Sequence, residues 1–436
     1  MCGIIGYIGQ KEAHPLLVKG LERLEYRGYD SAGVCTVDNG RLKLFKKQGR
    51  VEILKSTSLS GTRGIGHTRW STHGKPADHN AHPFIDQTGS FSVVHNGIIE
   101  NYLELKEELR QQGVQFSSET DSEVIVHLIA QNYTDNLKEA VLRTIPRLQG
   151  AYAFCVLHQE SNEIIGARNG SPLVVGVGEQ EHFLASDVSA FIEHTKNVIY
   201  LNDFEIARIT PDKVEITTFQ NQKQPLVIKR AEWDLEQAQK QGYKHFMLKE
   251  IFEQPLVIEE SLKVSIHLSP RPFRIIIVAC GTASYAGLVG EYIIEKIAKI
   301  PVLHEIASEF RYKEPLLNSS DLVIAISQSG ETADTLAAVR LAKQHGAKTL
   351  GIINVVDSTI AREVDEVIYT RAGPEIGVAS TKAFTAQLVT LYSLAFQWAG
   401  KSFPKEMLAT ALQRTLMQNE TIKQLAARQP VILLNS

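Results

Sequence analysis

The sequence predicts two successive architectures: a layered α+β domain, followed by an α/β domain with a doubly wound parallel sheet. Residues 1 to about 225 contain many short, β-branched or alternating segments that end at Gly, Asn or Asp, with helical patterns inserted in blocks. From about residue 256 to 400, continuous apolar segments each lead into a helical pattern, which is typical of buried parallel strands with crossover helices.

The first domain is expected to combine strands at GIIGYIG, SAGVCTV, RLKLFKK, RGIGHTR, FSVVHNG, AYAFCVL, EIIGARN and FEIARIT. Apolar residues at three- and four-residue spacing predict its helices. These helices cover residues 13–24, 102–112, 122–133 and 137–148. We therefore place this domain at residues 1–225, and we interpret the polar, charged stretch inside 226–255 as a linker with some helix.

The second domain, residues 256–405, has predicted strands at FRIIIVACGT, DLVIAISQSG and KTLGIINVV. The final region, 406–436, reads as a helical connection that ends in PVILLNS. PVILLN is similar to the opening of FRIIIVACGT, which leads into a loop and a helix. We therefore expect that a second α/β domain begins there and is incomplete in this chain.

The composition is that of an ordinary globular protein. The chain has 436 residues, enough for two or three domains, with the 43% hydrophobic and 22% charged content of an ordinary globular protein. A net charge of −3 gives no reason to expect nucleic acid or a membrane surface as a partner. The four cysteines are far apart, without metal-ligand or disulfide spacing, and we find neither a signal peptide nor a membrane span. We expect a cytoplasmic protein without a metal or cofactor.

Cys2, in MCGIIGYIG, is the most informative single residue. After removal of Met1, it would carry a thiol, with a pKa near ~8.5, and a free α-amino group, with a pKa near ~8. One residue then supplies a nucleophile and its general base. An isolated Cys2 would be read as a small buried residue, but the predicted strand that follows fixes the position of this terminus.

Several polar motifs in the first domain fit the needs of such a nucleophile. Attack on an amide creates an oxyanion that needs preorganised donors, and an amino-acid substrate needs a cation for its carboxylate and an anion for its ammonium group. Taken singly, each charged residue is better read as a surface charge, and HNG as a turn. The residues concerned are Arg27, Arg69, Trp70, His82, Asn96, Gly97 and Asp121.

Together, the segments MCGIIGYIG, LEYRGYDSAG, HTRWSTHG, NAHPF, VVHNGIIEN and SETDSEVI resemble the glutaminase domain of class II glutamine amidotransferases, over essentially all of 1–225. The resemblance implies the N-terminal-nucleophile hydrolase fold and glutamine as ammonia donor. It implies that Cys2 is the nucleophile, Asn96 and Gly97 the oxyanion hole, Arg69 and Asp121 the clamps on glutamine, Trp70 a gate on the ammonia passage, and Arg27 and His82 residues that organise the site.

The second domain has two Ser/Thr-rich loops that each follow a buried strand and open a helix, CGTAS and SQSGET. Backbone N–H groups at a helix N-terminus bind phosphate, and hydroxyls add donors. One such loop would be read as ordinary helix capping. Two loops at the carboxyl ends of neighbouring strands favour a ligand crevice, although no GxxxxGK[ST] motif indicates a nucleotide.

These loops, with HEIASEFRY, EIGVASTKAFT and KHFMLKEIFEQP, resemble the sugar isomerase (SIS) domain of the glutamine–fructose-6-phosphate aminotransferase family. Many members have Ser directly after CGT, where this chain has Ala283 and then Ser284, which we expect to compensate. The residues implied to bind the sugar phosphate are Thr282, Ser284, Ser327, Gln328, Ser329, Thr332, Val378 and Ser380.

The resemblance implies glutamine and fructose 6-phosphate as substrates, glucosamine 6-phosphate and glutamate as products, and a homodimer. It also implies that the sugar chemistry needs a second SIS domain and a C-terminal tail, which this sequence does not contain. We therefore expect a complete glutaminase half and an incomplete synthase half. The alternative is a glutaminase whose SIS module senses a sugar phosphate without aminating it.

Overall fold

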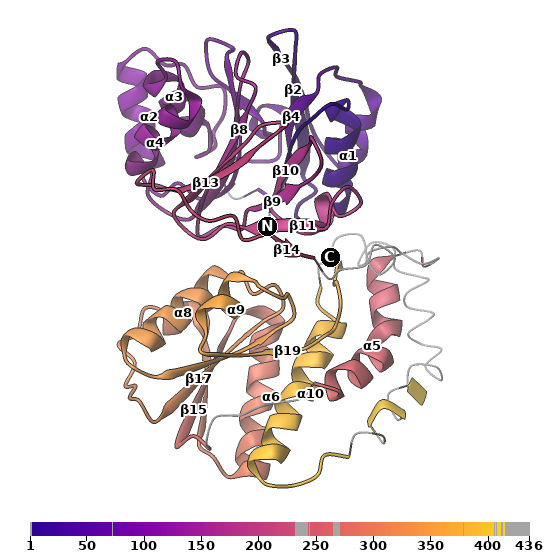
Figure 1. Cartoon of the computed structure of the whole chain (residues 1–436). Coiled ribbons are helices and arrows are strands. Elements are labelled where there is room, and N and C mark those ends of the chain that lie inside the picture. The colour runs from indigo at the N-terminus through magenta and orange to yellow at the C-terminus, as the bar shows by residue number, and fades with distance from the viewer. Residues whose placement is uncertain are drawn as a thin grey trace. The chain divides into compact units, whose positions relative to one another are not determined.

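The computed structural model describes residues 2–71, 73–231, 243, 245–264, 271–377, 379–404, 406, 408–410 and 413–414, with Tyr26 as backbone only. The chain forms two compact units, residues 1–232 and 233–436. Figure 1 shows the two units, the first in indigo to magenta and the second in orange to yellow. Each unit has its own sheets and its own hydrophobic core.

Unit 1 is a four-layer arrangement in which two antiparallel sheets pack face to face between helices (Figure 1). Its described part has an eight-stranded sheet, in the order β14-β11-β9-β10-β1-β4-β2-β3, and a six-stranded sheet, in the order β13-β12-β8-β7-β6-β5. Apolar side chains such as Ile4, Val94 and Cys155 fill the space between the sheets. Because each sheet is covered on both faces, strands such as GIIGYI are apolar along their whole length rather than alternating.

The helices of unit 1 cover the two outer faces. Helix α1 presents Leu17, Leu21 and Leu24 to the eight-stranded sheet, at the spacing of one helix face. Helices α2, α3 and α4 pack on the six-stranded sheet through residues such as Leu109 and Ile125. The predicted four helices are confirmed, since each begins within one residue of its expected start. The bounds are β1 Gly3–Ile8, α1 Ala13–Leu24, β2 Ser31–Asp38, β3 Arg41–Gln48, β4 Arg63–Arg69, β5 Phe84–Ile85, β6 Phe91–Gly97, α2 Tyr102–Gln111, α3 Glu123–Asn132, α4 Leu137–Thr144, β7 Tyr152–His158, β8 Ile164–Asn169, β9 Val174–Val177, β10 His182–Ala185, β11 Asn197–Tyr200, β12 Glu205–Ile209, β13 Val214–Thr218 and β14 Lys229–Arg230.

Unit 2 is a three-layer α/β/α domain, as predicted. Its five strands are all parallel, in the order β16-β15-β17-β18-β19, and the central residues of the three inner strands, β15, β17 and β18, are buried. Helices α6 and α10 cover one face, and α7, α8 and α9 cover the other (Figure 1). The bounds are α5 Phe246–Leu262, β15 Arg274–Ala279, α6 Gly281–Ala298, β16 Val302–Ile306, α7 Ala307–Phe310, β17 Asp321–Ser327, α8 Ala333–Gln344, β18 Lys348–Ile353, α9 Thr359–Glu363, β19 Glu366–Tyr369 and α10 Lys382–Trp398.

The stretch that we interpreted as a linker, 226–255, includes β14 and the first ten residues of α5. Helix α5 packs on α10, where Ile258 and Leu262 meet Val389. The helical connection and strand expected over 406–436 lie for the most part outside the described residues.

Glu123 holds the segment that leads into α3. It is buried at the first position of this helix, and its carboxylate accepts hydrogen bonds from the backbone N–H and the hydroxyl of both Ser117 and Ser118. Burial alone would raise the pKa of Glu123, but the contact with His127, whose Nε2 lies 3.6 Å away, and the hydrogen bonds from Ser118 and Ser117 outweigh it and lower the pKa to about 2. Because the folded protein favours the charged carboxylate of Glu123, this residue stabilises this part of unit 1 at pH values above its pKa in the unfolded chain, ~4.3.

We predict that Glu123→Gln lowers the local free energy of unfolding by about 2 kcal/mol at pH 7. A folded-state pKa near 2 means that this contribution disappears as the pH falls from about 4.5 towards 2, so the two proteins should converge there. Hydrogen exchange of the α3 amides measures the difference. Glu104→Gln, which alters an exposed acid in the first turn of α2, is the control. Equal protection of α3 in the wild type and the Glu123 variant at pH 7 would contradict the prediction.

Candidate functional site

Three strand ends bring the predicted glutaminase residues together in unit 1. Cys2 precedes β1, and Arg69 ends β4, which pairs with β1 in the eight-stranded sheet. Asn96 and Gly97 end β6, in the facing six-stranded sheet. The site therefore lies where strand ends of the two sheets meet, and residues from separate sequence motifs contact one another there.

The main chain of Cys2 is held by two side chains. Its carbonyl oxygen accepts hydrogen bonds from Arg27 Nε at 3.1 Å and from Asn96 Nδ2 at 3.2 Å. Its sulfur lies 3.3 Å from the backbone nitrogen of Trp70, which donates to it. Burial raises the pKa of the Cys2 thiol, and the contact with the Trp70 backbone opposes this rise. At neutral pH the thiol is therefore largely protonated, and its attack on an electrophile would need a base.

Gly97 occupies a position that no other residue fits. Its φ is +114°, and a Cβ atom built there would lie 2.0 Å from the carbonyl oxygen of Ala151. The next residues of the chain are fixed by Ile98 N, which donates to Ala151, and by Ile99 N, which donates to Asp121 Oδ2 at 2.8 Å. The HNG turn that the sequence predicted is thus a rigid backbone corner tied to Asp121.

Arg69 and Asp121 are both buried, although each is charged. One terminal nitrogen of Arg69, Nη2, donates to the carbonyls of His73 and Gly74, whereas Nη1 is buried and has no hydrogen-bond partner in the described structure. Asp121 lies 3.9 Å from His73 Nδ1, and Ser122 donates to it at 3.4 Å. A buried guanidinium nitrogen without an acceptor is costly unless a ligand supplies one, so Arg69 is a suitable carboxylate receptor.

The remaining predicted residues of this site lie around it. Trp70 is partly exposed, and its indole packs edge-to-face on Tyr29 with ring centroids 5.3 Å apart. Arg27 also lies 3.7 Å from Asp187. The Nδ1 atom of His82 accepts a hydrogen bond from the backbone N–H of His95 at 3.2 Å. His82 thus supports β6 from behind, next to Asn96.

The two Ser/Thr-rich loops of unit 2 leave neighbouring strands. The chain runs from β15 outward to β16 and then returns to β17 on the other side of β15, so the strand order reverses between β15 and β17. In open α/β sheets, ligands bind outside the carboxyl ends of the strands at such a switch point. The loops that follow β15 and β17 open helices α6 and α8, whose N-termini favour an anion.

Internal hydrogen bonds shape the loop after β17. Ser327 Oγ accepts from Gly330 N at 2.9 Å and lies 3.1 Å from the hydroxyl of Thr332. Gly330 has a φ of +66°, and a Cβ atom there would overlap Ser358 Oγ, which is itself buried without a partner in the described structure. Ser329 Oγ accepts from the backbone N–H of Glu331 at 3.2 Å, and Gln328 is half-buried beside it.

Among the other predicted sugar residues, Thr282 is exposed in the first turn of α6. Ser284 is buried, and its hydroxyl lies 2.8 Å from His304 Nε2 on β16, so its hydrogen bond runs to the sheet. Ser380 donates to the carboxylate of Glu375 at 2.8 Å. Val378 lies outside the described residues.

Two carboxylates hold the loop that carries Ser380, and the motif analysis assigned a role to neither. Glu250 of α5 accepts from the backbone N–H groups of Ile376 and Gly377, and Glu375 accepts from Thr381 N and Ala383 N. Burial raises the pKa of Glu250, and these backbone donors oppose the rise. Glu250 was missed because it lies 126 residues before Ile376 in the chain. The only sequence signal was its place in the polar segment KHFMLKEIFEQP.

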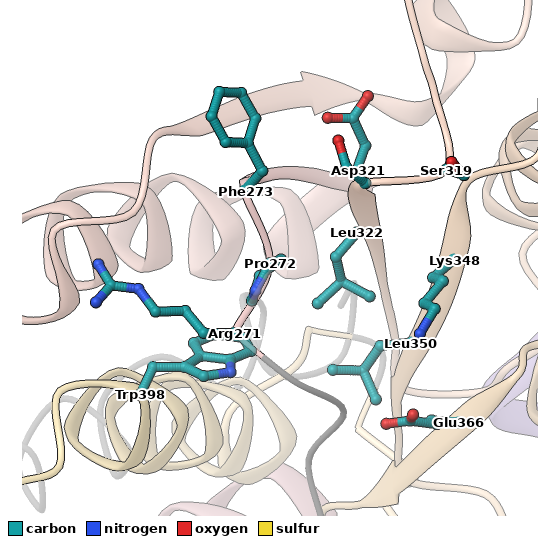
Figure 2. A pocket seen from close by; sticks show the side chains of 11 residues that line it. Arg271, Pro272, Phe273, Ser319, Asp321, Leu322, Lys348, Leu350, Glu366 and Trp398 are labelled. Carbon is teal, nitrogen blue, oxygen red and sulfur yellow. The ribbon is translucent and has the colours of Figure 1, made fainter.

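A pocket of about 270 Å³ lies at the N-terminal ends of the strands of the unit 2 sheet (Figure 2). Figure 2 shows Leu322 and Leu350 pointing into it from β17 and β18, with the indole of Trp398 opposite and Lys348 and Glu366 at its rim. Since β17 and β18 begin here, this pocket lies away from the carboxyl ends, where the Ser/Thr-rich loops are. It is therefore separate from the candidate sugar-phosphate crevice.

Within the described residues, no cluster of three or more His, Cys, Asp or Glu side chains has the arrangement of a metal site. Among the same residues, no helix is both long enough and apolar enough to cross a membrane.

Comparison with known proteins identifies both units. A glutamine amidotransferase domain family matches residues 67–193, and the SIS domain family matches 267–396. Glutamine–fructose-6-phosphate aminotransferase [isomerizing] of Aquifex aeolicus is 52% identical over 426 residues, covering 95% of this chain and 72% of the relative. A Thermus thermophilus protein of the same name is 49% identical over 418 residues, covering 92% and 69%. Among solved structures, the C-terminal domain of the Francisella tularensis glucosamine-fructose-6-phosphate aminotransferase is 39% identical, with a TM-score of 0.38, covering 43% of this chain and 58% of that one.

Proposed function

Because the chain belongs to the glutamine–fructose-6-phosphate aminotransferase family, we propose that it takes ammonia from glutamine and transfers it to fructose 6-phosphate, forming glutamate and glucosamine 6-phosphate. The observation that carries the glutaminase half is that Cys2 contacts Asn96 and the backbone of Trp70, the residue after Arg69, whose guanidinium nitrogen Nη1 is buried without a partner in the described structure. A thiol, an oxyanion donor and a carboxylate receptor are what hydrolysis of a glutamine side chain requires.

In the proposed reaction, the α-amino group of Cys2, freed by removal of Met1, takes the thiol proton as the sulfur attacks the side-chain amide carbon of glutamine. The C=O π electrons move to oxygen, and the resulting oxyanion is held by Asn96 Nδ2 and the backbone N–H of Gly97. The ammonium group then returns the proton to the leaving nitrogen, the C–N bond breaks, and ammonia departs. Water hydrolyses the γ-glutamyl thioester to glutamate and restores the thiol.

Arg69 is proposed to bind the α-carboxylate of glutamine and Asp121 its α-ammonium group. Arg69 Nη2 is already used by two backbone carbonyls, so the guanidinium cannot turn away from the site, and Nη1 remains for the substrate. Arg27 fixes the Cys2 carbonyl, His82 supports β6, and Trp70, with its exposed indole, is proposed to gate the passage of ammonia.

The sugar phosphate is proposed to bind at the switch point between β15 and β17. The helix N-termini and hydroxyls there supply donors for the phosphate, through Thr282, Ser327, Gln328, Ser329 and Thr332, with Val378 and Ser380 beside the sugar. Ser284 is proposed to donate its O–H to the phosphate while its oxygen accepts from His304 Nε2, 2.8 Å away. In this proposal, residues 1–225 release the ammonia, residues 256–405 bind the sugar phosphate, and residues 226–255 connect them. The division of the chain into two compact units, 1–232 and 233–436, supports such a separation of tasks.

One observation favours a second candidate function, in which unit 2 senses the sugar phosphate without aminating it. The carboxylates nearest its loops are engaged, since Glu331 accepts from Thr359 and Glu375 accepts from Ser380 and two backbone N–H groups. They are therefore poorly placed for proton transfer to a sugar, whereas the loop hydroxyls suit binding.

We predict that the purified chain forms glutamate from glutamine, and that Cys2→Ala, or retention of Met1, lowers this rate at least about 10³-fold while the fold persists. The assay follows glutamate and glucosamine 6-phosphate separately in the presence of fructose 6-phosphate. Both products support the aminotransferase, and glutamate alone supports the sensing function. An active Cys2→Ala protein would remove the nucleophile assignment. Cys35→Ala, a change in the buried core, is the control.

Fructose 6-phosphate should raise the melting temperature of unit 2, because a ligand that binds only the folded state stabilises it. Ser329→Ala removes one loop hydroxyl and should weaken the binding about 10- to 100-fold, as expected for a lost hydrogen bond to a charged group. Ser319→Ala, an exposed serine at the N-terminal ends of the strands of this sheet, should have no effect. No stabilisation at millimolar sugar phosphate would remove the assignment of this crevice.

We further propose a cytoplasmic location, since a reducing compartment preserves a reactive thiol. We also propose a homodimer. Tyr285 and Tyr292 of α6, with Leu303 of the edge strand β16, are large exposed apolar side chains on adjoining elements and suit a subunit interface. We predict that light scattering finds a dimer and that Tyr292→Asp dissociates it. Leu103→Asp, an equally exposed position on α2, should not. A monomeric wild type would contradict the dimer.

A further inference from the structure

We propose that His67 is a positioning residue for the glutaminase reaction: its neutral imidazole donates Nε2–H to Asn96 and thereby orients the amide that faces the oxyanion. This inference rests on the proposed function, in which Asn96 stabilises the tetrahedral intermediate. His67 is not among the site residues that the sequence motifs predicted. It lies on β4, two residues before Arg69, and is fully buried.

The hydrogen-bond network fixes both the amide and the imidazole. Asn96 lies between the carbonyl oxygen of Cys2, 3.2 Å from its Nδ2, and His67 Nε2, 3.0 Å from its Oδ1. A carbonyl oxygen accepts hydrogen bonds and cannot donate them, so the amide nitrogen of Asn96 must face Cys2 and its oxygen must face His67. It follows that His67 Nε2 carries the proton. With the opposite tautomer, two lone pairs would face each other across 3.0 Å.

The surroundings of His67 keep it neutral. Its ring stacks on His82 with centroids 4.1 Å apart and planes 15° apart, and Arg69 and His95 lie near it. Burial, together with the charges of His95 and Arg69, lowers the pKa of His67 to about 3, against the raising effect of the bond to Asn96. The other ring nitrogen, Nδ1, is buried without a hydrogen-bond partner in the described structure. The hydrogen bond to Asn96 is the one of normal geometry that the described structure gives this imidazole, and a weaker contact with the His95 backbone also raises its pKa.

This contact matters because an amide donor is useful only when its direction is fixed before the charge develops. The Asn96 amide has two N–H donors; one is directed at Cys2, which leaves the second for the oxyanion. Without His67, the Asn96 oxygen would lack a partner in the core, and rotation of the side chain would carry both donors away. Donation to Oδ1 also polarises the amide and strengthens its N–H groups. His82 acts on the same strand through the His95 backbone, so two histidines hold β6.

Two matched variants separate this role from simple packing. His67→Gln keeps a donor nitrogen near the position of Nε2, whereas the shorter His67→Asn places its amide near Nδ1, out of reach of Asn96. We expect His67→Asn to lower the kcat of glutamine hydrolysis by about 10- to 100-fold, less than the loss of an oxyanion donor itself, with the KM changed less than about threefold. His67→Gln should recover most of the rate. The same pair at His158, a buried histidine on β7, is the control and should leave kcat unchanged.

A second readout uses glutamate γ-semialdehyde, whose aldehyde carbon accepts the Cys2 sulfur. In this thiohemiacetal, the former aldehyde oxygen occupies the oxyanion position. His67→Asn should weaken inhibition by the semialdehyde by the same factor as kcat, while the affinity for norvaline, which has the same α-carboxylate and α-ammonium groups but no side-chain oxygen, stays constant. Equal behaviour of the Gln and Asn variants, or a parallel loss of norvaline affinity, would overturn the proposal.

A third measurement does not depend on activity. In protein labelled with ¹⁵N-histidine, the His67 resonances should show a protonated Nε2 and a bare Nδ1 that do not titrate between pH 5 and 8, and Asn96→Ala should shift them. An Nδ1–H tautomer or a titrating ring would refute the role of His67, whatever the glutaminase assay shows. Conversely, the expected spectrum in a chain that does not hydrolyse glutamine would count against the proposed function alone.

Discussion

The glutaminase site depends on the pair of hydrogen bonds that close on the carbonyl oxygen of Cys2. One donor, Arg27, follows helix α1, which covers the eight-stranded sheet, and the other, Asn96, ends a strand of the six-stranded sheet. A single backbone oxygen thus ties the start of β1 to the segment that follows α1 and to the six-stranded sheet. Because the sheets are packed face to face by apolar residues, neither donor can shift without disturbing that packing, and the thiol is held in one place.

Buried charge serves as scaffolding throughout the molecule. Glu123 binds the N–H groups of Ser117 and Ser118, Glu250 those of Ile376 and Gly377, and Glu375 those next to Ser380. A carboxylate that accepts several backbone N–H groups fixes a loop without needing a strand partner, and this is how irregular segments beside both candidate sites keep one conformation. These acids sit within or next to the motifs, so they are easily mistaken for groups that touch substrate.

Much of the fold follows from local pattern. The spacing of Leu17, Leu21 and Leu24 predicts α1, and the continuous apolar segments of unit 2 predict buried parallel strands, because both signals lie within one element. The motif residues of the glutaminase site were also predictable as a set, and the structure brings Cys2, Arg27, Asn96 and the Trp70 backbone into contact. What could not be predicted depends on register between elements. The Ser284 hydroxyl, expected to compensate for Ala283, meets His304, since that face of α6 lies against the sheet.

The role of His67 could not be predicted from the sequence either. Nothing in GHTRWSTHG separates it from His73, because both are histidines beside polar residues. Only the pairing of β4 with β1, and the packing of that sheet on β6, place His67 against Asn96 and leave His73 half-buried near Asp121. An imidazole in the core has two ring nitrogens, and the cost of leaving Nδ1 unpaired must be offset by what Nε2 does. A phenylalanine would fill the same volume at lower cost, so the presence of a histidine is best explained by its hydrogen bond to Asn96.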